Sequence, residues 1–318
     1  MQKASFDPGL TQQYAGNLKR VINKDGGFNV YRTGFTWRDV HPYLFLINLR
    51  WPQFLLVVLA AFLVLNTLFA SLYMLIGADS VYGARAPSPW MSFVNVMFFS
   101  SHTLTTVGYG NMYPVGVAGN CLASFESLVG LLSFALATGL LFGRFARPSA
   151  RIGFSPTMLV APYRDTTSLQ FRVVNRRPNN LIDLEARLTL MTVENIDGRL
   201  GRKYTALQLE REQVLFFPLT WTVVHPIDES SPLSGKTADQ LRQMQAEVLV
   251  MMKGFDDTFG QNVHARYSYR YDEITWGARF APAFEFDREG NMHVEVNKVG
   301  VLEKVALPQP AALPEARS

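Results

Sequence analysis

Two long runs of apolar residues constrain this chain more than any other feature of its sequence. From Trp51 to Ile76 there is no charged side chain, and from Val115 to Gly143 the only charged residue is Glu126. A helix needs about 20 apolar residues to cross the hydrocarbon core of a bilayer, and both runs are longer than that. A buried core helix of a soluble protein is the alternative, but charge-free runs of this length are rare in soluble cores. The sequence therefore predicts two membrane-spanning helices.

Basic residues indicate how the two spans are oriented. Arg85 is the only lysine or arginine between them. The residues ahead of the first span include Lys19, Arg20, Lys24, Arg32, Arg38 and Arg50, and Arg144, Arg147 and Arg151 follow the second. Because cytoplasmic flanks carry the excess of Lys and Arg, we expect both chain termini in the cytoplasm.

Composition narrows the function classes. The formal net charge of +4 over 318 residues is mild, whereas a nucleic-acid partner would require a denser basic stripe. The single cysteine, Cys121, leaves no intrachain disulfide and no cysteine-based zinc site. The first residues, Met1–Tyr14, are polar and lack the apolar run of a cleavable signal peptide. We therefore expect no nucleic-acid binding, and membrane insertion through the internal runs.

The region between the spans ends in a short glycine-containing loop. Trp90–Leu104 is apolar and aromatic but too short to span, which favours a re-entrant helix. Its C-terminal dipole would favour a cation. The loop that follows contains Thr-Val-Gly-Tyr-Gly, residues 106–110. Irregular backbone at membrane depth is tolerated only where it is buried in protein or lines a water-filled path.

The loop has a specific use in such a place. Glycine adopts positive φ at no steric cost, so Gly108 and Gly110 permit a backbone of alternating handedness whose carbonyls all face one axis. The side chains of Val107 and Tyr109 would then point away from that axis. The pentapeptide is identical to the filter sequence of known potassium channels, and the filter role is assigned from this identity. The predicted K⁺ ligands are the carbonyls of Thr106, Val107, Gly108 and Tyr109 and the Thr106 hydroxyl, with four chains completing each ring.

The remainder of the chain is rich in β signals. Alternating segments occur at 168–174, 185–193, 247–253 and 262–270, separated by turn-forming residues. Many short strands at such spacing predict a β-sandwich of the immunoglobulin type. One helical insert is expected over Thr237–Gln245, where Thr237 and Gln240 have capping-box spacing.

Three motifs in this order resemble the inward-rectifier potassium channels, and the short loops resemble their prokaryotic (KirBac) branch. The motifs are the filter, H-P-I-D-E-S-S-P-L from His225 to Leu233, and D-E-I-T-W-G from Asp272 to Gly277. The resemblance covers the chain from about Thr36 to Val299. It implies an α-helical membrane pore, with two transmembrane helices and a re-entrant pore helix per subunit around a fourfold axis. It also implies a cytoplasmic immunoglobulin-like β-sandwich domain.

The resemblance also assigns the segments. They are an N-terminal cytoplasmic segment (1–35), an interfacial slide helix (36–50), a first transmembrane helix (51–78), a pore helix (90–104), the filter (105–111), a second transmembrane helix (115–146), the sandwich (152–300) and a flexible tail (301–318). A homotetramer in the inner (plasma) membrane of a prokaryote is implied, with K⁺ as the bound permeant ion and no cofactor.

Several roles carry over to the second span. Phe134 matches a cavity position that is acidic in strong rectifiers, so strong block from the cavity is not expected. Phe142 matches the constriction at the helix-bundle crossing, where apolar rings gate by dewetting. Ordinary packing or lipid contact is the alternative for both phenylalanines. Gly130, Gly139 and Gly143 are candidate hinges, or else close-packing residues of a membrane helix.

The resemblance also implies roles for basic residues that flank the two spans and for one loop of the sandwich. Anionic phospholipids, phosphoinositides among them, are the expected lipid partners, because the basic positions match headgroup-binding positions of the animal members. These candidates are Arg50, Trp51, Arg144, Arg147 and Arg151; the alternative is an orienting role in which the arginines reach lipid phosphate. The 254–262 loop matches a cytoplasmic constriction, with Gly254 and Gly260 suited to a narrow turn. Asp256 and Asp257 would concentrate cations there, unless the loop is simply a solvated turn.

Two polar residues are expected near the filter, and the first of them departs from the family pattern. His102 lies in the pore helix where relatives often have a glutamate, and Glu126 lies in the second span. An intramembrane carboxylate is a functional or structural candidate by default. We expect both residues to support the filter from behind, and we expect them to contact each other.

The leading hypothesis is a potassium-selective channel, gated at the inner-helix bundle and by the cytoplasmic domain. A membrane-anchored cytoplasmic ligand-binding or sensor protein with a non-conducting pore is the alternative. An enzyme is not expected. The sequence contains no nucleophile elbow and no phosphate loop, and His225, His264 and His293 are scattered.

Overall fold

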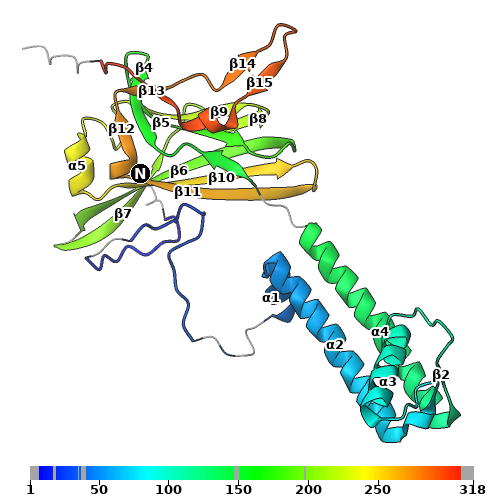
Figure 1. Ribbon diagram of the computed structural model, residues 1–318. Coiled ribbons are helices and arrows are strands. Elements are labelled where there is room, and N and C mark those ends of the chain that lie inside the picture. The colour runs from blue at the N-terminus through cyan, green and yellow to red at the C-terminus, as the bar shows by residue number, and fades with distance from the viewer. Residues whose placement is uncertain are drawn as a thin grey trace, which may run out of the picture. The chain divides into compact units, whose positions relative to one another are not determined.

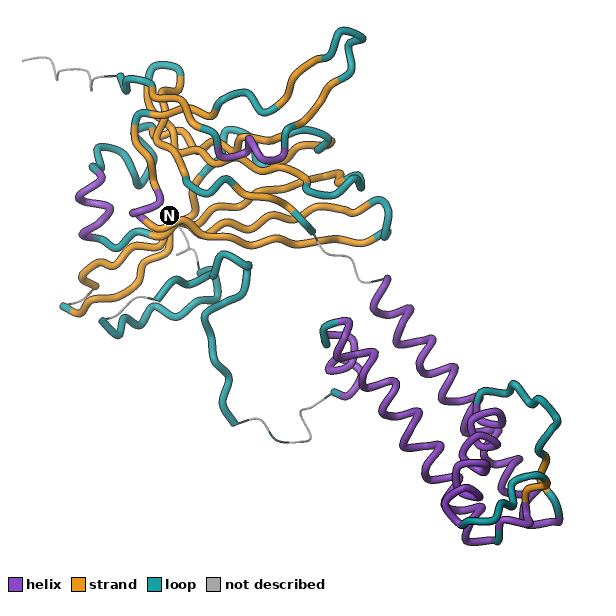
Figure 2. Tube along the Cα trace, in the orientation of Figure 1, coloured by secondary structure: helices purple, strands orange, loops and turns teal. Residues whose placement is uncertain are grey.

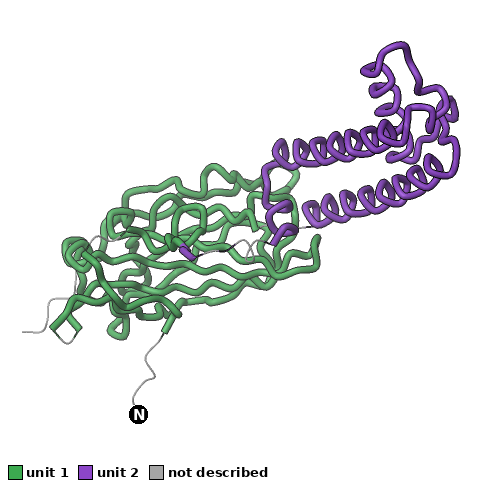
Figure 3. The backbone as a smooth tube through the Cα atoms, turned by 90° about the horizontal axis from the view of Figure 1, so that it is seen from below, with its two compact units in different colours: residues 1–31, 148–318 green, residues 32–147 purple. Residues whose placement is uncertain are grey.

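The chain forms two compact units in a computed structural model that describes residues 7–16, 19–34, 36, 41–146, 150–196 and 198–308. One unit is Arg32–Arg147, and the other combines Met1–Tyr31 with Pro148–Ser318 (Figure 3). The first is helical and the second is built mainly of strands (Figure 2). This division agrees with the predicted fold class.

The helical unit contains four α-helices (Figure 1). They are α1 (Pro42–Asn48), α2 (Trp51–Ile76), α3 (Pro89–Leu104) and α4 (Gly116–Phe145). Only 17% of the most apolar window of α2, and the same share in α4, is buried within the chain. A core helix of a soluble protein would be mostly buried, so this exposure favours the membrane-spanning interpretation.

The C-terminal part of α2, the N-terminal part of α4 and the helix α3 share an apolar cluster. Phe69 and Tyr73 of α2 pack with Val96 and Phe99 of α3 and with Ala123 of α4. A 3₁₀ turn, Ala78–Ser80, leads to a small ladder of β1 (Val81–Tyr82) and β2 (Tyr113–Pro114). This ladder joins the two segments that flank the pore helix and its loop. The cluster and the ladder together hold α3 between the two long helices.

The other unit is a sandwich of two five-stranded sheets. One sheet has the order β11 (Gln261–Arg270), β10 (Glu247–Asp256), β6 (Leu181–Ile196), β7 (Arg199–Leu207), with β8 (Gln213–Phe216) paired to β6. The other has the order β12 (Ile274–Trp276), β4 (Met158–Tyr163), β5 (Thr166–Asn175), β3 (Ile152–Phe154), with β9 (Thr220–Ile227) paired to β5. All pairs in these sheets are antiparallel except β12 with β4.

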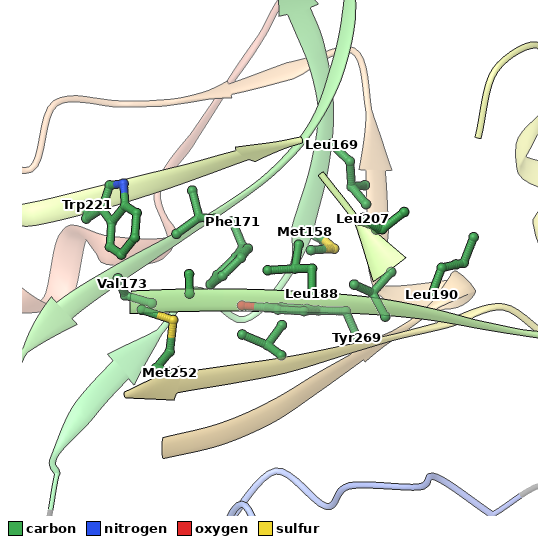
Figure 4. Packing of buried hydrophobic residues seen from close by; sticks show 14 of the residues in the cluster. Met158, Leu169, Phe171, Val173, Leu188, Leu190, Leu207, Trp221, Met252 and Tyr269 are labelled. Atoms are coloured by element: carbon green, nitrogen blue, oxygen red, sulfur yellow. The ribbon is translucent and has the colours of Figure 1, made fainter. Parts of the chain in front are cut away.

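The core of the sandwich lies between the two sheets. Phe171 of β5, Leu188 of β6, Met252 of β10 and Tyr269 of β11 converge there, all at most 3% exposed (Figure 4). The alternating segments expected from the sequence lie within β5, β6, β10 and β11. Alternation places one side of each strand in this core, whereas the other side varies: Lys253 of β10 is exposed, but Leu249 of the same strand is buried against Ile22 of the N-terminal segment.

The predicted helical insert is present as α5 (Ala238–Gln243). The Thr237 hydroxyl accepts from the Gln240 N–H at 3.3 Å, and the Gln240 side chain accepts from the Thr237 N–H at 2.9 Å. This reciprocal pair is the predicted capping box. Leu241 is buried against the core, so the helix covers one end of the sandwich.

The N-terminal segment is attached to the sandwich. Arg20 and Lys24 bind the Glu273 carboxylate at 2.6 and 2.8 Å, and Ile22 is buried. The carboxylate of Glu247, itself 3% exposed, accepts the Val21 N–H at 3.1 Å. The segment predicted over 1–35 is therefore ordered through these contacts in its described residues.

The sandwich unit continues past the predicted boundary at residue 300. β16 (Leu302–Lys304) pairs with β13 (Ala278–Phe280), so the prediction of a flexible tail was wrong for these residues. Residues 309–318 lie outside the described part of the chain. A hairpin of β14 (Phe284–Phe286) and β15 (Met292–Val294), with 3₁₀ turns at Tyr271–Glu273 and Val296–Gly300, completes the unit.

Candidate functional site

The glycine loop is tied to the end of the pore helix by its own amide groups. The N–H of Thr106 donates to the carbonyl of Thr103 at 3.0 Å. The N–H groups of Val107 and Gly108 both donate to the carbonyl of His102, at 2.9 and 3.1 Å. The last carbonyls of a helix have no partner within it, and here the loop supplies one. Three consecutive loop amides thus point to the same side.

The backbone of the loop alternates in handedness. Thr106, Gly108 and Gly110 have φ of 60°, 56° and 80°. The sequence indicated positive φ at the two glycines but not at Thr106, because a β-branched residue rarely adopts it. When positive and negative φ alternate, the carbonyls of successive peptides point to one side and their N–H groups to the other. This agrees with the common direction of the three amides.

The carbonyls opposite these amides therefore face away from the pore helix. Within a peptide unit the C=O and the following N–H point in opposite directions. The amides of Val107 and Gly108 point to the helix, so the carbonyls of Thr106 and Val107 point to the other side. Residues 105–111 are all exposed in a single chain. Such a row of unpaired oxygens at membrane depth requires an ion, water or further chains.

His102 supports the loop through two contacts. Its carbonyl accepts the two amides described above, and its ring meets the Tyr109 ring edge-on with centroids 4.7 Å apart. Glu126 contacts other groups: its carboxylate lies 2.9 Å from the Tyr73 hydroxyl and 2.5 Å from the Ser100 hydroxyl. The prediction that His102 and Glu126 contact each other was therefore wrong within one chain. The His102 side chain lies beside the glycine loop, whereas the Glu126 side chain lies among α2, α3 and α4.

Phe134 and Phe142 are both open to their surroundings in the single chain. They are 74% and 72% exposed and lie about two turns apart on α4. A cavity of about 650 Å³ between α2 and α4 is lined by Phe134 together with Thr105 and Thr106 at the end of the pore helix. This places Phe134 on the same cavity as the first residues of the glycine loop. Phe142 does not line that cavity.

The three candidate hinge glycines have different surroundings. A Cβ on Gly130 would collide with the backbone carbonyl of Leu104 at the end of the pore helix. A Cβ on Gly143 would lie 2.5 Å from the hydroxyl of Tyr43 in α1. Gly139 has nothing within 4 Å of such an atom. Close packing therefore accounts for Gly130 without a hinge, whereas no contact within a single chain requires glycine at 139.

The structure gives Arg144 a partner other than lipid. Its guanidinium donates to the carbonyls of Leu46 and Ile47 at 2.8 and 2.9 Å and of Leu49 at 2.8 Å. It also lies 4.6 Å from the Trp51 ring. These carbonyls end α1, so Arg144 joins the short N-terminal helix to α4.

The other candidate headgroup residues fall in separate places. Arg50 precedes α2, and Arg151 precedes β3 of the other unit. Both are exposed. Arg147 lies outside the described residues.

The candidate constriction loop is the turn between β10 and β11. Gly260 has φ of 61°, and Gly254 sits at a register shift where a Cβ would be 2.9 Å from Leu184. Asp256 is fully buried and accepts from the Asn179 amide at 2.7 Å and from two turn amides. The prediction that Asp256 concentrates cations was therefore wrong, because its carboxylate fastens the turn from inside. Asp257 is exposed.

Sequence reasoning missed several polar residues around the site. Tyr73, Ser100 and Asn66 are fully buried between the helices, and only their contacts distinguish them from ordinary helix residues. Asn66 lies in the middle of a mostly apolar span, and its amide was a signal that the sequence offered, since strongly polar groups inside the membrane are rare. In the described ranges no group of three or more His, Cys, Asp or Glu side chains could hold a metal ion.

Comparisons with known proteins cover both units. A family model described as "Inward rectifier potassium channel C-terminal domain" matches residues 152–317, and one described as "Ion channel" matches residues 54–147. Inward rectifier potassium channel Kirbac3.1 of Paramagnetospirillum magnetotacticum is 37% identical, over 88% of this chain and 94% of the relative. ATP-sensitive inward rectifier potassium channel 12 of Gallus gallus is 28% identical, over 87% of this chain and 70% of the relative. Inward rectifier potassium channel irk-1 of Caenorhabditis elegans is 26% identical, over 86% and 55%.

Proposed function

The chain belongs to the inward rectifier potassium channel family, and from that premise we propose that four copies assemble into one potassium-selective pore. It is a transmembrane ion-transport protein and not an enzyme. The observation that carries the proposal is the loop at 106–110, with positive φ at alternate residues and amides directed to the pore helix. Its oxygens are exposed in one chain, and a ring of four chains would enclose them around K⁺.

The selectivity filter consists of Thr106, Val107, Gly108, Tyr109 and Gly110. The permeant ion is held by backbone carbonyls, so no cofactor takes part. Selectivity depends on replacing the water shell of K⁺ with oxygens at fixed positions, and the bonds from Val107 and Gly108 to His102 hold those oxygens in place.

The filter is tested by changing Gly108 to alanine. Alanine at φ of 56° is strained, so the loop should leave the alternating geometry. Wild-type protein in liposomes should pass rubidium or thallium, be blocked by barium and exclude sodium. Gly108→Ala should abolish this flux while the sandwich keeps its thermal unfolding midpoint. Normal flux in the variant would remove the filter assignment, and monomeric wild-type protein on native mass spectrometry would remove the tetramer.

Gating is proposed at the inner end of α4. Phe142 from four subunits would form an apolar neck that closes by dewetting, and motion of the cytoplasmic domain would open it. Phe134 supplies no charge to the cavity beside the filter, so weak block by intracellular cations is expected. Phe142→Ser should raise flux by hydrating the neck, and Leu128→Ser, at another exposed α4 position, is the control.

Anionic lipid is proposed as a regulator acting on the basic cytoplasmic flank. Because Arg144 is occupied by α1 carbonyls, the headgroup contacts are assigned to Arg50, Arg147 and Arg151 with Trp51. Flux should change when phosphoinositide is added to neutral liposomes, and Arg50→Gln with Arg151→Gln should reduce the change. Arg85→Gln, between the two spans, is the matched control. An unchanged response in the double variant would exclude these two arginines as headgroup contacts.

The proposed location is the inner membrane of a prokaryote, with both termini in the cytoplasm. The charge bias across the spans supports this orientation. Protease digestion of sealed inside-out vesicles should remove the sandwich unit, whereas right-side-out vesicles should protect it. The alternative of a sensor with a non-conducting pore predicts no rubidium flux under any lipid condition.

A further inference from the structure

Four polar side chains are enclosed among the three long helices of the membrane unit. They are Asn66 and Tyr73 of α2, Ser100 of α3 and Glu126 of α4, and each is at most 1% exposed. The Tyr73 hydroxyl lies 2.9 Å from Glu126 Oε2, and the Ser100 hydroxyl lies 2.5 Å from Glu126 Oε1 and 3.2 Å from Asn66 Oδ1. The group thus bridges all three helices.

The orientation of the Asn66 amide is set by a neighbour. Its Nδ2 donates to the carbonyl of Phe62 at 2.7 Å, so Oδ1 is the atom that faces Ser100. Oδ1 can only accept a hydrogen bond. Ser100 therefore lies between two oxygen acceptors, Asn66 Oδ1 and Glu126 Oε1.

A count of hydrogens distinguishes the two states of Glu126. The Ser100 hydroxyl has one hydrogen, and an ionised carboxylate has none to give. With ionised Glu126, Ser100 satisfies one acceptor and leaves the other unpaired in a membrane interior. With neutral Glu126, the acid donates to Ser100 Oγ, Ser100 donates to Asn66 Oδ1, and Tyr73 donates to the acid carbonyl. Only the neutral state pairs every group and buries no net charge.

We propose that Glu126 is a neutral carboxylic acid in a hydrogen-bond relay, Tyr73 to Glu126 to Ser100 to Asn66, which positions the pore helix behind the filter. The filter role itself rests on the function proposed above. Glu126, Tyr73 and Ser100 are positioning residues, because none of them touches the ion path in the described structure.

The relay reaches the filter through one turn of α3. Ser100 is two residues before His102, whose carbonyl accepts the amides of Val107 and Gly108. A shift of α3 along its axis would move this carbonyl and therefore the loop oxygens. Fixing Ser100 to both α2 and α4 prevents that shift.

The test uses the full-length protein and compares Glu126→Gln with Glu126→Leu. Glutamine reproduces the neutral acid, because its amide N–H can donate to Ser100 Oγ and its oxygen can accept from Tyr73. We expect Glu126→Gln to keep the wild-type rubidium-to-sodium flux ratio within about twofold. Glu126→Leu leaves the Tyr73 hydroxyl without an acceptor, while Ser100 keeps Asn66 Oδ1 as its own acceptor. We expect the ratio to fall about tenfold, the change that corresponds to one lost buried hydrogen bond. Tyr73→Phe, which removes one hydroxyl and keeps the ring, should give an intermediate fall.

An infrared measurement gives a readout that does not depend on flux. The carbonyl-stretch band of a protonated carboxylic acid should appear in the wild type at neutral pH and vanish in Glu126→Gln. Absence of that band, or a Glu126→Gln variant as poor in selectivity as Glu126→Leu, would overturn the relay. If the band is present but the wild type passes no ions, the relay stands and the proposed channel function fails.

Discussion

Alanine at Gly130 is expected to displace α4 from the end of the pore helix. An added Cβ would lie 2.9 Å from the carbonyl carbon of Leu104 and 3.0 Å from its Cα, and closer still to the carbonyl oxygen. Carbon atoms in ordinary contact are about 3.5–4.0 Å apart. The carbonyl oxygen sets the requirement, so the helices must separate by at least roughly 1 Å, because backbone atoms cannot rotate aside as a side chain can.

A matched substitution in the same helix isolates this effect. Gly139 has no atom within 4 Å of an added Cβ, so alanine fits there without displacement. Both variants gain about 1 kcal/mol of helix propensity, which cancels in the comparison. Overpacking costs about 1–3 kcal/mol, and this range is the expected difference in stability between Gly130→Ala and Gly139→Ala.

The assay is thermal unfolding of the purified protein, with rubidium flux measured on the same preparations. Gly130→Ala should melt below wild type or close to it, and Gly139→Ala above it. Flux should fall only in Gly130→Ala, because the displaced contact adjoins the filter. Equal melting of the two variants would refute the packing argument. A flux loss confined to Gly139→Ala would instead identify a hinge there.

Three further outcomes are expected. Asp256→Ala should destabilise the sandwich unit by about 1–3 kcal/mol in chemical denaturation, since buried donors lose their acceptor, whereas Asp257→Ala at an exposed position should stay within about 0.5 kcal/mol. Burial lowers the pKa of His225 from 6.5 despite an opposing hydrogen bond to a backbone carbonyl. Just below pH 6.5 the imidazole is therefore protonated in the unfolded chain but still neutral in the folded chain. Stability should therefore fall as the pH drops below 6.5, and His225→Asn should flatten that slope in pH-dependent melting curves. Arg144→Lys keeps the charge but loses the planar donor fork, so hydrogen exchange in α1 should accelerate; no acceleration beyond that of an Arg50→Lys control would contradict the contact.

Features that depend on local sequence were predictable. The spans follow from their charge-free length, and the capping box of α5 follows from Thr237 and Gln240. Gly108 and Gly110 predicted positive φ, which both residues have, because few other residues adopt it freely. The four alternating segments indicated strands with one buried face.

Features that depend on distant residues were not predictable. Asp256 was taken for a loop carboxylate because its acceptor role depends on Asn179, which lies 77 positions earlier in the chain. Glu126 was given the wrong partner because Tyr73 and Ser100 come from two other helices. In the sequence Arg144 resembles any basic residue at a membrane edge. Its role depends on the carbonyls of Leu46, Ile47 and Leu49, which only the folded chain brings to its guanidinium. In each case the sequence shows the polar group but not the fold that selects its partner.

The row of oxygens along residues 106 and 107 consists of main-chain atoms. Every amino acid carries the same carbonyl, so a substitution can neither add nor remove one of these oxygens. What a mutation can alter is the handedness that aims them, and at 108 and 110 glycine alone adopts it without strain. A substitution in this segment can therefore disturb the direction of the oxygens but not their chemistry, which is common to all polypeptides.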